Sequence, residues 1–203
     1  MKIAVVGATG NAGSHIVKEL VARGHTVTAI SRHAEKVAGP GVTTQSIDVA
    51  DGAALAKALE GHDAVVSAVR FVAADAAGLI DAVKRSGVRR YLVVGGASSL
   101  FTPGTTERRL DRPDFPDTYR AEATAGADFL ALLRAEKTLD WVSLAPSTLF
   151  MGTERRGTFR LGKDELLIAA DGTSAISFPD YAIALADEIE APKYHQDRFT
   201  VGY

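Results

Sequence analysis

Three glycines spaced three residues apart stand near the start of the chain, in the segment Gly7-Ala8-Thr9-Gly10-Asn11-Ala12-Gly13. An apolar run over residues 3–6 precedes them, and apolar residues recur at helical spacing after them. Glycine suits a tight strand-to-helix turn because it adopts dihedrals that a Cβ disfavours and lets a ligand approach the backbone closely. The pattern predicts the βαβ opening of a Rossmann unit, whose first helix points its positive end at a pyrophosphate. A glycine-rich turn without a ligand is the alternative.

Strands and helices alternate through the rest of the chain, which predicts an α/β fold. We expect further strands at residues 26–31, 43–48, 64–69, 91–95, 141–146, 166–169 and 199–201, and helices at residues 12–23, 53–59, 73–85, 119–136 and 180–189. Near-continuous apolar strands such as Ala64-Val65-Val66 are typical of a parallel sheet covered on both faces. The expected fold is a Rossmann-type, doubly wound, mainly parallel sheet with a small C-terminal extension on the substrate side. It forms one domain over residues 1–203, with a core at 1–146 and a substrate-side segment at 147–203.

Composition excludes several classes of protein. A net charge of −2 with interspersed charges disfavours nucleic acid as a partner. No apolar run approaches the roughly 20 residues of a transmembrane helix, and no secretory signal pattern is visible. The chain has no cysteine and its five histidines lack metal-ligand spacing, so we expect no disulfide and no metal site. A cytoplasmic protein without membrane contact is the simplest interpretation.

The end of the second predicted strand indicates which nicotinamide cofactor the chain prefers. NAD sites usually carry an acidic residue there, which binds the ribose hydroxyls and would repel a 2′-phosphate. This chain has Ser31 and Arg32 instead, which can donate a hydroxyl and a planar guanidinium to a phosphate. The pair favours NADP(H) over NAD(H), although Arg32 could equally be a solvated charge. His33 is a less favoured second phosphate ligand.

Other cofactor contacts follow from topology, because ligands bind outside the carboxyl ends of parallel strands. Asp48 is expected to end the third strand and accept the adenine amino group, with Val49 packed nearby. Alternatively, Asp48 caps the next helix, a role that Asp51 could also fill. The remaining contacts expected at strand ends are Ser67, Ala68, Val69, Gly95, Gly96 and Ala97.

The sequence lacks the tyrosine and lysine pair, four residues apart, by which most short-chain reductases transfer a proton to a carbonyl oxygen. None of the five tyrosines is followed by lysine at that spacing. Tyr119 is therefore a substrate contact or a structural residue, and Ser98 and Ser99 either bind substrate or form a turn. No catalytic residue is identified, and Ser98, Ser99 and Tyr119 are the candidates. Hydride transfer to a π-acceptor such as flavin requires least of such a site, since protons come from solvent.

Several segments, taken together, are similar to one family across almost the whole chain. They are the glycine segment 7–13, Val93-Val94-Gly95-Gly96-Ala97, Pro113-Asp114-Phe115-Pro116, Arg160-Leu161-Gly162, Asp180-Tyr181-Ala182 and Arg198-Phe199-Thr200-Val201-Gly202-Tyr203. The chain resembles the NADH-flavin reductases, atypical short-chain dehydrogenase relatives grouped with NmrA-like and biliverdin-IX-beta-reductase-like NAD(P)H-binding proteins. The resemblance implies an NAD(P)H-dependent oxidoreductase with FMN, FAD or riboflavin as candidate acceptors.

The resemblance also implies roles for individual residues. The three loop glycines with Thr9, Asn11 and Ala12 would hold the pyrophosphate, Arg32 the 2′-phosphate, and Pro146, Ser147 and Thr148 the nicotinamide end. Arg155 and Arg156 would meet an anionic substrate tail or stay solvated. The family usually has glycine and then serine after Gly-Gly-Ala, whereas this chain has Ser98-Ser99, whose extra side chain would narrow the substrate side.

Two functional hypotheses remain open at this point. The first is an NADPH-dependent reductase of a flavin or similar planar acceptor, and the second is an NmrA-like regulator that senses NADP(H) without turnover. A sugar epimerase or dehydratase is disfavoured by the missing tyrosine and lysine pair. Leu100 and Phe101 are expected to be exposed and to line a substrate lid or a dimer contact. The sequence does not determine the oligomeric state.

Overall fold

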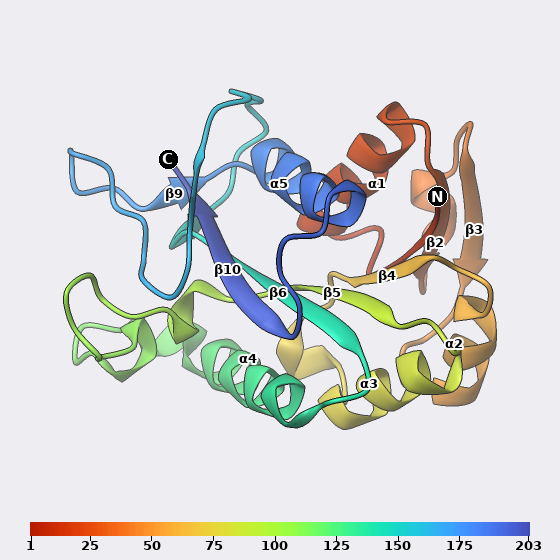
Figure 1. Cartoon of the computed structure of the whole chain (residues 1–203), viewed down its shortest axis with the longest axis horizontal. Coiled ribbons are helices and arrows are strands. Elements are labelled where there is room, and N and C mark those ends of the chain that lie inside the picture. Colours follow the sequence, from red (N-terminus) through yellow and green to blue (C-terminus); the bar gives the residue numbers. More distant parts are fainter.

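The alternating strands of the chain assemble into a central eight-stranded sheet with helices on both faces (Figure 1). This computed structural model describes all residues, 1–203. The sheet contains, in spatial order, β3 (Val42–Ser46), β2 (Thr26–Ser31), β1 (Lys2–Val6), β4 (Ala64–Ser67), β5 (Arg90–Val94), β6 (Asp140–Pro146), β10 (Asp197–Gly202) and β8 (Arg160–Gly162). All neighbours run parallel except β8, which is antiparallel to β10. The predicted fold class, a mainly parallel Rossmann-type sheet, is confirmed.

Helices form a layer on each face of the sheet. The helices are α1 (Asn11–Ala22), α2 (Gly52–Leu59), α3 (Ala76–Arg85), α4 (Asp117–Ala135) and α5 (Phe178–Glu190). Helices α1 and α5 lie side by side on one face, while α2, α3 and α4 cover the other (Figure 1). None of the five combines the length and the apolar character that crossing a bilayer requires.

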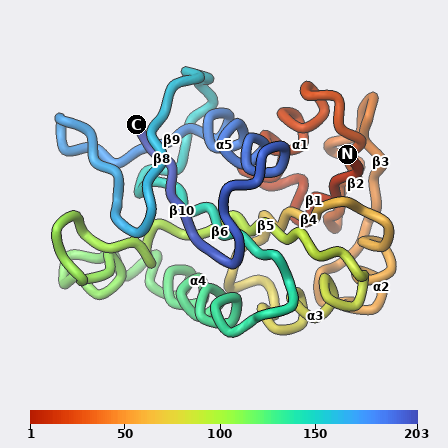
Figure 2. Tube along the Cα trace, in the orientation of Figure 1, coloured from red at the N-terminus to blue at the C-terminus, as the bar shows by residue number.

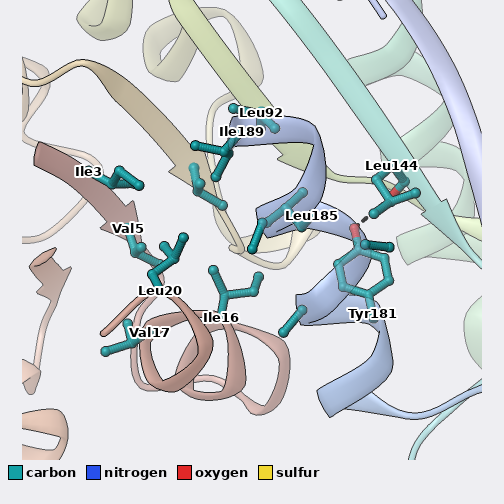
Figure 3. Packing of buried hydrophobic residues seen from close by; sticks show 14 of the residues in the cluster. Ile3, Val5, Ile16, Val17, Leu20, Leu92, Leu144, Tyr181, Leu185 and Ile189 are labelled. Carbon is teal, nitrogen blue, oxygen red and sulfur yellow. Dashed lines mark hydrogen bonds between the residues drawn. The ribbon is translucent and has the colours of Figure 1, made fainter. Parts of the chain in front are cut away.

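Side chains of β1 alternate between two buried cores. Ile3 and Val5 face α1 and α5, and Ala4 and Val6 face the opposite helices. Figure 3 shows the first of these cores, in which the Tyr181 hydroxyl donates to the Leu144 carbonyl oxygen at 2.7 Å. Burial raises the pKa of Tyr181, so its hydroxyl stays neutral and anchors α5 to β6.

The strand order reverses direction between β1 and β4. The chain builds outward from β1 through β2 to β3, then crosses back to add β4 on the other side of β1. The chain therefore leaves β1 and β4 toward opposite faces of the sheet, to α1 and α3. In open α/β sheets ligands bind outside the carboxyl ends of the strands at such a switch point, and the candidate site lies there.

The C-terminal region differs most from expectation. The strand expected at residues 166–169 is wrong: the region pairs instead through β8, and a short separate pair joins β7 (Leu149–Phe150) to β9 (Ala175–Ile176). These segments gather near the C-terminus (Figure 2). Leu166, an apolar residue of the expected strand, instead packs in a small buried cluster with Ala145 and Leu100. Leu100 is fully buried, so the expectation that it is exposed is also wrong.

Candidate cofactor site

The turn that joins β1 to α1 brings three backbones into close contact. Gly7 has a φ of +81°, and a Cβ there would lie 2.5 Å from the carbonyl oxygen of Ala68, which follows β4. A Cβ at Gly13 would lie 2.2 Å from the carbonyl oxygen of Gly7. Both distances are far below van der Waals contact, so this approach of β1, β4 and α1 requires glycine at both positions.

The first turn of α1 leaves its backbone donors free. The amides of Asn11, Ala12 and Gly13 donate to no backbone or side-chain acceptor. Gly10 precedes the helix without a side-chain cap, and the first turn holds no acidic residue. Unpaired amides at the positive end of a helix dipole form an anion-binding site, so these residues fit a pyrophosphate.

Hydrogen bonds hold this turn against the end of β2. The amides of Gly7 and Ala8 donate to the Ile30 carbonyl oxygen at 2.8 and 3.3 Å. The Thr9 hydroxyl donates to the Ser31 hydroxyl at 3.3 Å. Arg32 follows directly, is exposed, and forms no ion pair, whereas His33 lies 3.7 Å from Glu35. The Arg32 guanidinium is therefore available for a ligand on the ribose side of the turn.

Asp48 does not end the third strand as predicted, because β3 stops at Ser46. Its carboxylate instead accepts the Ala50 amide at 3.0 Å, within a local turn. Asp51 caps α2 by accepting the Ala54 amide at 3.0 Å. The capping alternative thus belongs to Asp51, and Asp48 lies exposed in the loop beside Val49.

The ends of β4, β5 and β6 line up along the same edge of the sheet. Ser67 is buried, and Ala68 and Val69 lead out toward the glycine turn. A Cβ at Gly95 would lie 2.7 Å from the Ser143 hydroxyl and 3.0 Å from the Leu144 carbonyl oxygen, so the close approach of β6 requires glycine directly after β5. Partly buried Gly96 and Ala97 continue this edge.

The residues expected at the nicotinamide end divide into two groups. Pro146 and Ser147 are buried, and the Ser147 hydroxyl donates to the Val201 carbonyl oxygen at 3.0 Å, so its side chain is engaged within the sheet. Thr148, the next residue, is exposed. Only Thr148 of the three offers a free side chain to a ligand.

Residues 7–192 match the model of a family described as NAD(P)H-binding. The chain belongs to this family. YwnB, an uncharacterized protein of Bacillus subtilis (strain 168), is 41% identical over 212 residues, which cover 99% of this chain and 98% of YwnB.

Solved structures show the same likeness. A "putative NADH-flavin reductase" from Streptococcus pneumoniae TIGR4 is 36% identical, with a TM-score of 0.88 and coverage of 100% of this chain and 99% of that one. A "putative epimerase" from Bacteroides thetaiotaomicron is 39% identical, with a TM-score of 0.92 and coverage of 100% and 96%. Together they support an atypical, short-chain-dehydrogenase-like NAD(P)H-dependent oxidoreductase.

The side chains considered as catalytic in this NAD(P)H-binding protein have distinct surroundings. The Ser99 hydroxyl donates to the Gly96 carbonyl oxygen at 3.1 Å and accepts from Arg198, a nearly buried guanidinium, at 3.1 Å. Ser99 therefore has a structural role. Ser98 is partly buried, and Tyr119 on α4 is 64% exposed. No group of three side chains is arranged to hold a metal ion.

Sequence reasoning missed Glu122 on α4. Its carboxylate accepts the amides of Phe71 and Val72, at 2.7 and 3.3 Å, and thereby holds the loop that leaves β4. The Phe71 ring packs against Gly126, where a Cβ would lie 2.9 Å away. These partners are about fifty residues apart in sequence, and no local pattern links them.

The segment after β7 is also fixed in an unforeseen way. Arg155 forms an ion pair with Glu19, a buried residue of α1 that also pairs with Arg23 at 2.8 Å. Burial works to raise the pKa of Glu19, but hydrogen bonds from the two arginines outweigh it and lower that pKa. Arg155 keeps an exposed side chain, but its pairing with Glu19 leaves it less free for a substrate tail.

Asp180 fixes the next two residues of that segment. Its fully buried carboxylate accepts the backbone amides of Arg156 and Gly157 at 3.1 and 3.0 Å, and the Tyr203 hydroxyl at 2.7 Å. The Arg156 guanidinium lies 4.0 Å from the centroid of the Tyr203 ring. The C-terminal residue and α5 therefore hold this segment in place.

Gly13→Ala is expected to weaken NADPH binding by about tenfold or more, because the new Cβ must displace the turn that presents the free amides. Gly39→Ala is the matched control, since no atom lies within 4 Å of a Cβ there. Calorimetric titration measures both, and circular dichroism checks the fold. Equal affinity in Gly13→Ala and the native protein would contradict the assignment of the turn to the pyrophosphate.

Proposed function

We propose that the protein is an NADPH-dependent reductase that transfers a hydride to a flavin or a similar planar acceptor. The observation that supports it most is the set of unpaired amides at Asn11, Ala12 and Gly13. The unpaired Arg32 adds to it, since it follows Ser31, which contacts the same turn through Thr9. The amides suit the pyrophosphate that all nicotinamide dinucleotides share. The similarity to the reductase from Streptococcus pneumoniae supports the choice of acceptor.

Arg32 is the basis for preferring NADPH over NADH. It stands where an acidic residue would bind the adenine ribose of NAD, and its guanidinium is not neutralised by any carboxylate. A guanidinium forms paired hydrogen bonds with a phosphate, an interaction that NADH cannot provide. Ser31, held by Thr9, is placed to add a hydroxyl.

The reacting end of the site would lie along Gly95, Gly96, Ala97 and Thr148. When bound there, reduced nicotinamide supplies a hydride. The protein would orient the two planar groups and keep the loop after β4 closed against α4 through Glu122. A flavin-type acceptor suits this site, since the positions on α4 offer an exposed Tyr119 without a lysine four residues later. We propose the cytoplasm as its location, where NADPH is available.

Steady-state oxidation of NADPH, followed at its absorbance maximum, tests the proposal with FMN, riboflavin and a quinone as separate acceptors. We expect saturable oxidation with at least one of them and no accumulation of a covalent intermediate. Tight binding of NADPH without oxidation by any acceptor would contradict a reductase and favour the NADP(H)-sensing alternative.

Arg32→Ala is expected to raise the dissociation constant of NADPH by about tenfold or more while leaving that of NADH unchanged, because hydrogen bonds to a charged group contribute roughly 1.5–3 kcal/mol. Arg89→Ala is the control, since Arg89 is equally exposed but precedes β5 at the opposite edge of the sheet. Fluorescence titration measures the dissociation constants of NADPH and of NADH for both variants and for the native protein. Unchanged NADPH affinity in Arg32→Ala, with NADH still bound, would show that NADP(H) preference does not come from this residue.

A further inference from the structure

A cavity lies next to Thr148, at the reacting end of the proposed site. It has a volume of about 470 Å³ and lies between the segment 101–116 and the C-terminal residues 148–174. Thr148 lines this cavity and lies two residues after the end of β6. Another wall residue, Leu166, packs on Ala145 of β6. In Figure 1 the green segment 101–116 and the blue part of the second segment lie on the same side of the molecule, beyond the N-terminal end of α4.

Two arginines of this cavity point at one carboxylate oxygen. Arg109 Nη1 and Arg112 Nε each donate to Asp114 Oδ1, both at 3.0 Å. Asp114 is 62% exposed at its side chain, whereas Arg109 is only 19% exposed and lies 5.4 Å from the centroid of the Phe115 ring. The Arg109 guanidinium is thus held in place by its surroundings, while the Asp114 carboxylate is open to solvent.

The residues that line the cavity carry more positive than negative charge. Asp114 is the one acidic residue among those that line the cavity, against two arginines. Outside the lining, Glu107 pairs with Arg112 at 3.3 Å, and Arg108 pairs separately with Asp111. Desolvation works to raise the pKa of Asp114, but the hydrogen bond from Arg112 and the charges of Arg109 and Arg112 together outweigh it and lower that pKa, so this carboxylate is ionised. It occupies the position that an oxygen of a ligand anion would take.

The rest of the wall is suited to a planar group with polar edges. Leu149, Leu166 and Ile168 supply an apolar surface, and hydroxyls come from Thr148, Thr173 and Ser174. Thr102 also lines the cavity, and its Oγ1 is buried without a hydrogen-bond partner. An orphaned hydroxyl beside two guanidiniums is a further donor available to a bound anion.

We propose that this cavity binds a phosphate group carried by the planar acceptor, with Arg109 and Arg112 exchanging Asp114 for that phosphate. The inference rests on the proposed reductase function and identifies its acceptor class: a phosphorylated flavin is selected over the uncharged one. Asp114 then acts as an internal counter-ion that the phosphate of an acceptor must displace, whereas an uncharged acceptor leaves it in place.

FMN and riboflavin, which share one ring and differ in the phosphate, are the probes. Binding is followed by flavin fluorescence in the presence of NADP⁺, and turnover by NADPH oxidation. We expect FMN to bind at least about tenfold more tightly than riboflavin, and Arg109→Gln and Arg112→Gln each to remove most of that difference. Riboflavin constants should not change. Arg108→Gln is the matched control, because Arg108 lies in the same segment but does not line the cavity.

The Asp114→Asn substitution should tighten FMN binding several-fold, because it removes the competing carboxylate, and should leave riboflavin binding unaffected. A variant that failed to fold would instead lose FMN binding. The inference would be overturned if FMN and riboflavin bound with equal affinity, or if the Arg109, Arg112 and Arg108 variants behaved alike. Turnover of either flavin would still support the proposed reductase function. If neither flavin is bound nor reduced although NADPH binds, both the flavin function and this inference fail.

Discussion

The close approach of three backbones at the carboxyl edge of the sheet is the constraint on which the rest depends. Gly7, Gly13 and the carbonyl oxygen of Ala68 lie so near one another that no side chain fits between them. This packing sets the first turn of α1 directly above the gap between β1 and β4 and leaves its amides without partners. The same contact that closes the core therefore exposes the donors that an anion needs.

The C-terminal part of the chain completes this arrangement from the other side. Arg155 reaches Glu19 on α1, and Asp180 on α5 holds the two residues that follow Arg155. Both acidic groups are buried, and they fix the segment after β7 to α1 and α5, the two helices that cover one face of the sheet. Segments remote in sequence are thus joined to the helix whose first turn carries the unpaired amides.

Local patterns were sufficient to predict the fold and the glycine turn, because strand and helix periodicity and the φ requirement of Gly7 are properties of neighbouring residues. They were insufficient wherever a partner lies far along the chain. The pairing of Glu122 with the loop after β4 and the engagement of Ser99 by Arg198 depend on tertiary placement. The two-residue strands β7 and β9 are too short to show any period. Asp48 and Asp51 offered the same chemistry, and only the backbone decides which one caps α2.

An amide-resolved NMR titration with NADP⁺ tests most directly whether the unpaired donors of α1 hold the pyrophosphate. Because Asn11, Ala12 and Gly13 have no acceptor in the structure, their amide protons should show the largest downfield shifts, saturating at one equivalent. Arg32 should respond in the same titration, and less with NAD⁺. Saturable binding that leaves these three amides unshifted, or no binding at all, would contradict the assignment of this helix end as the cofactor site.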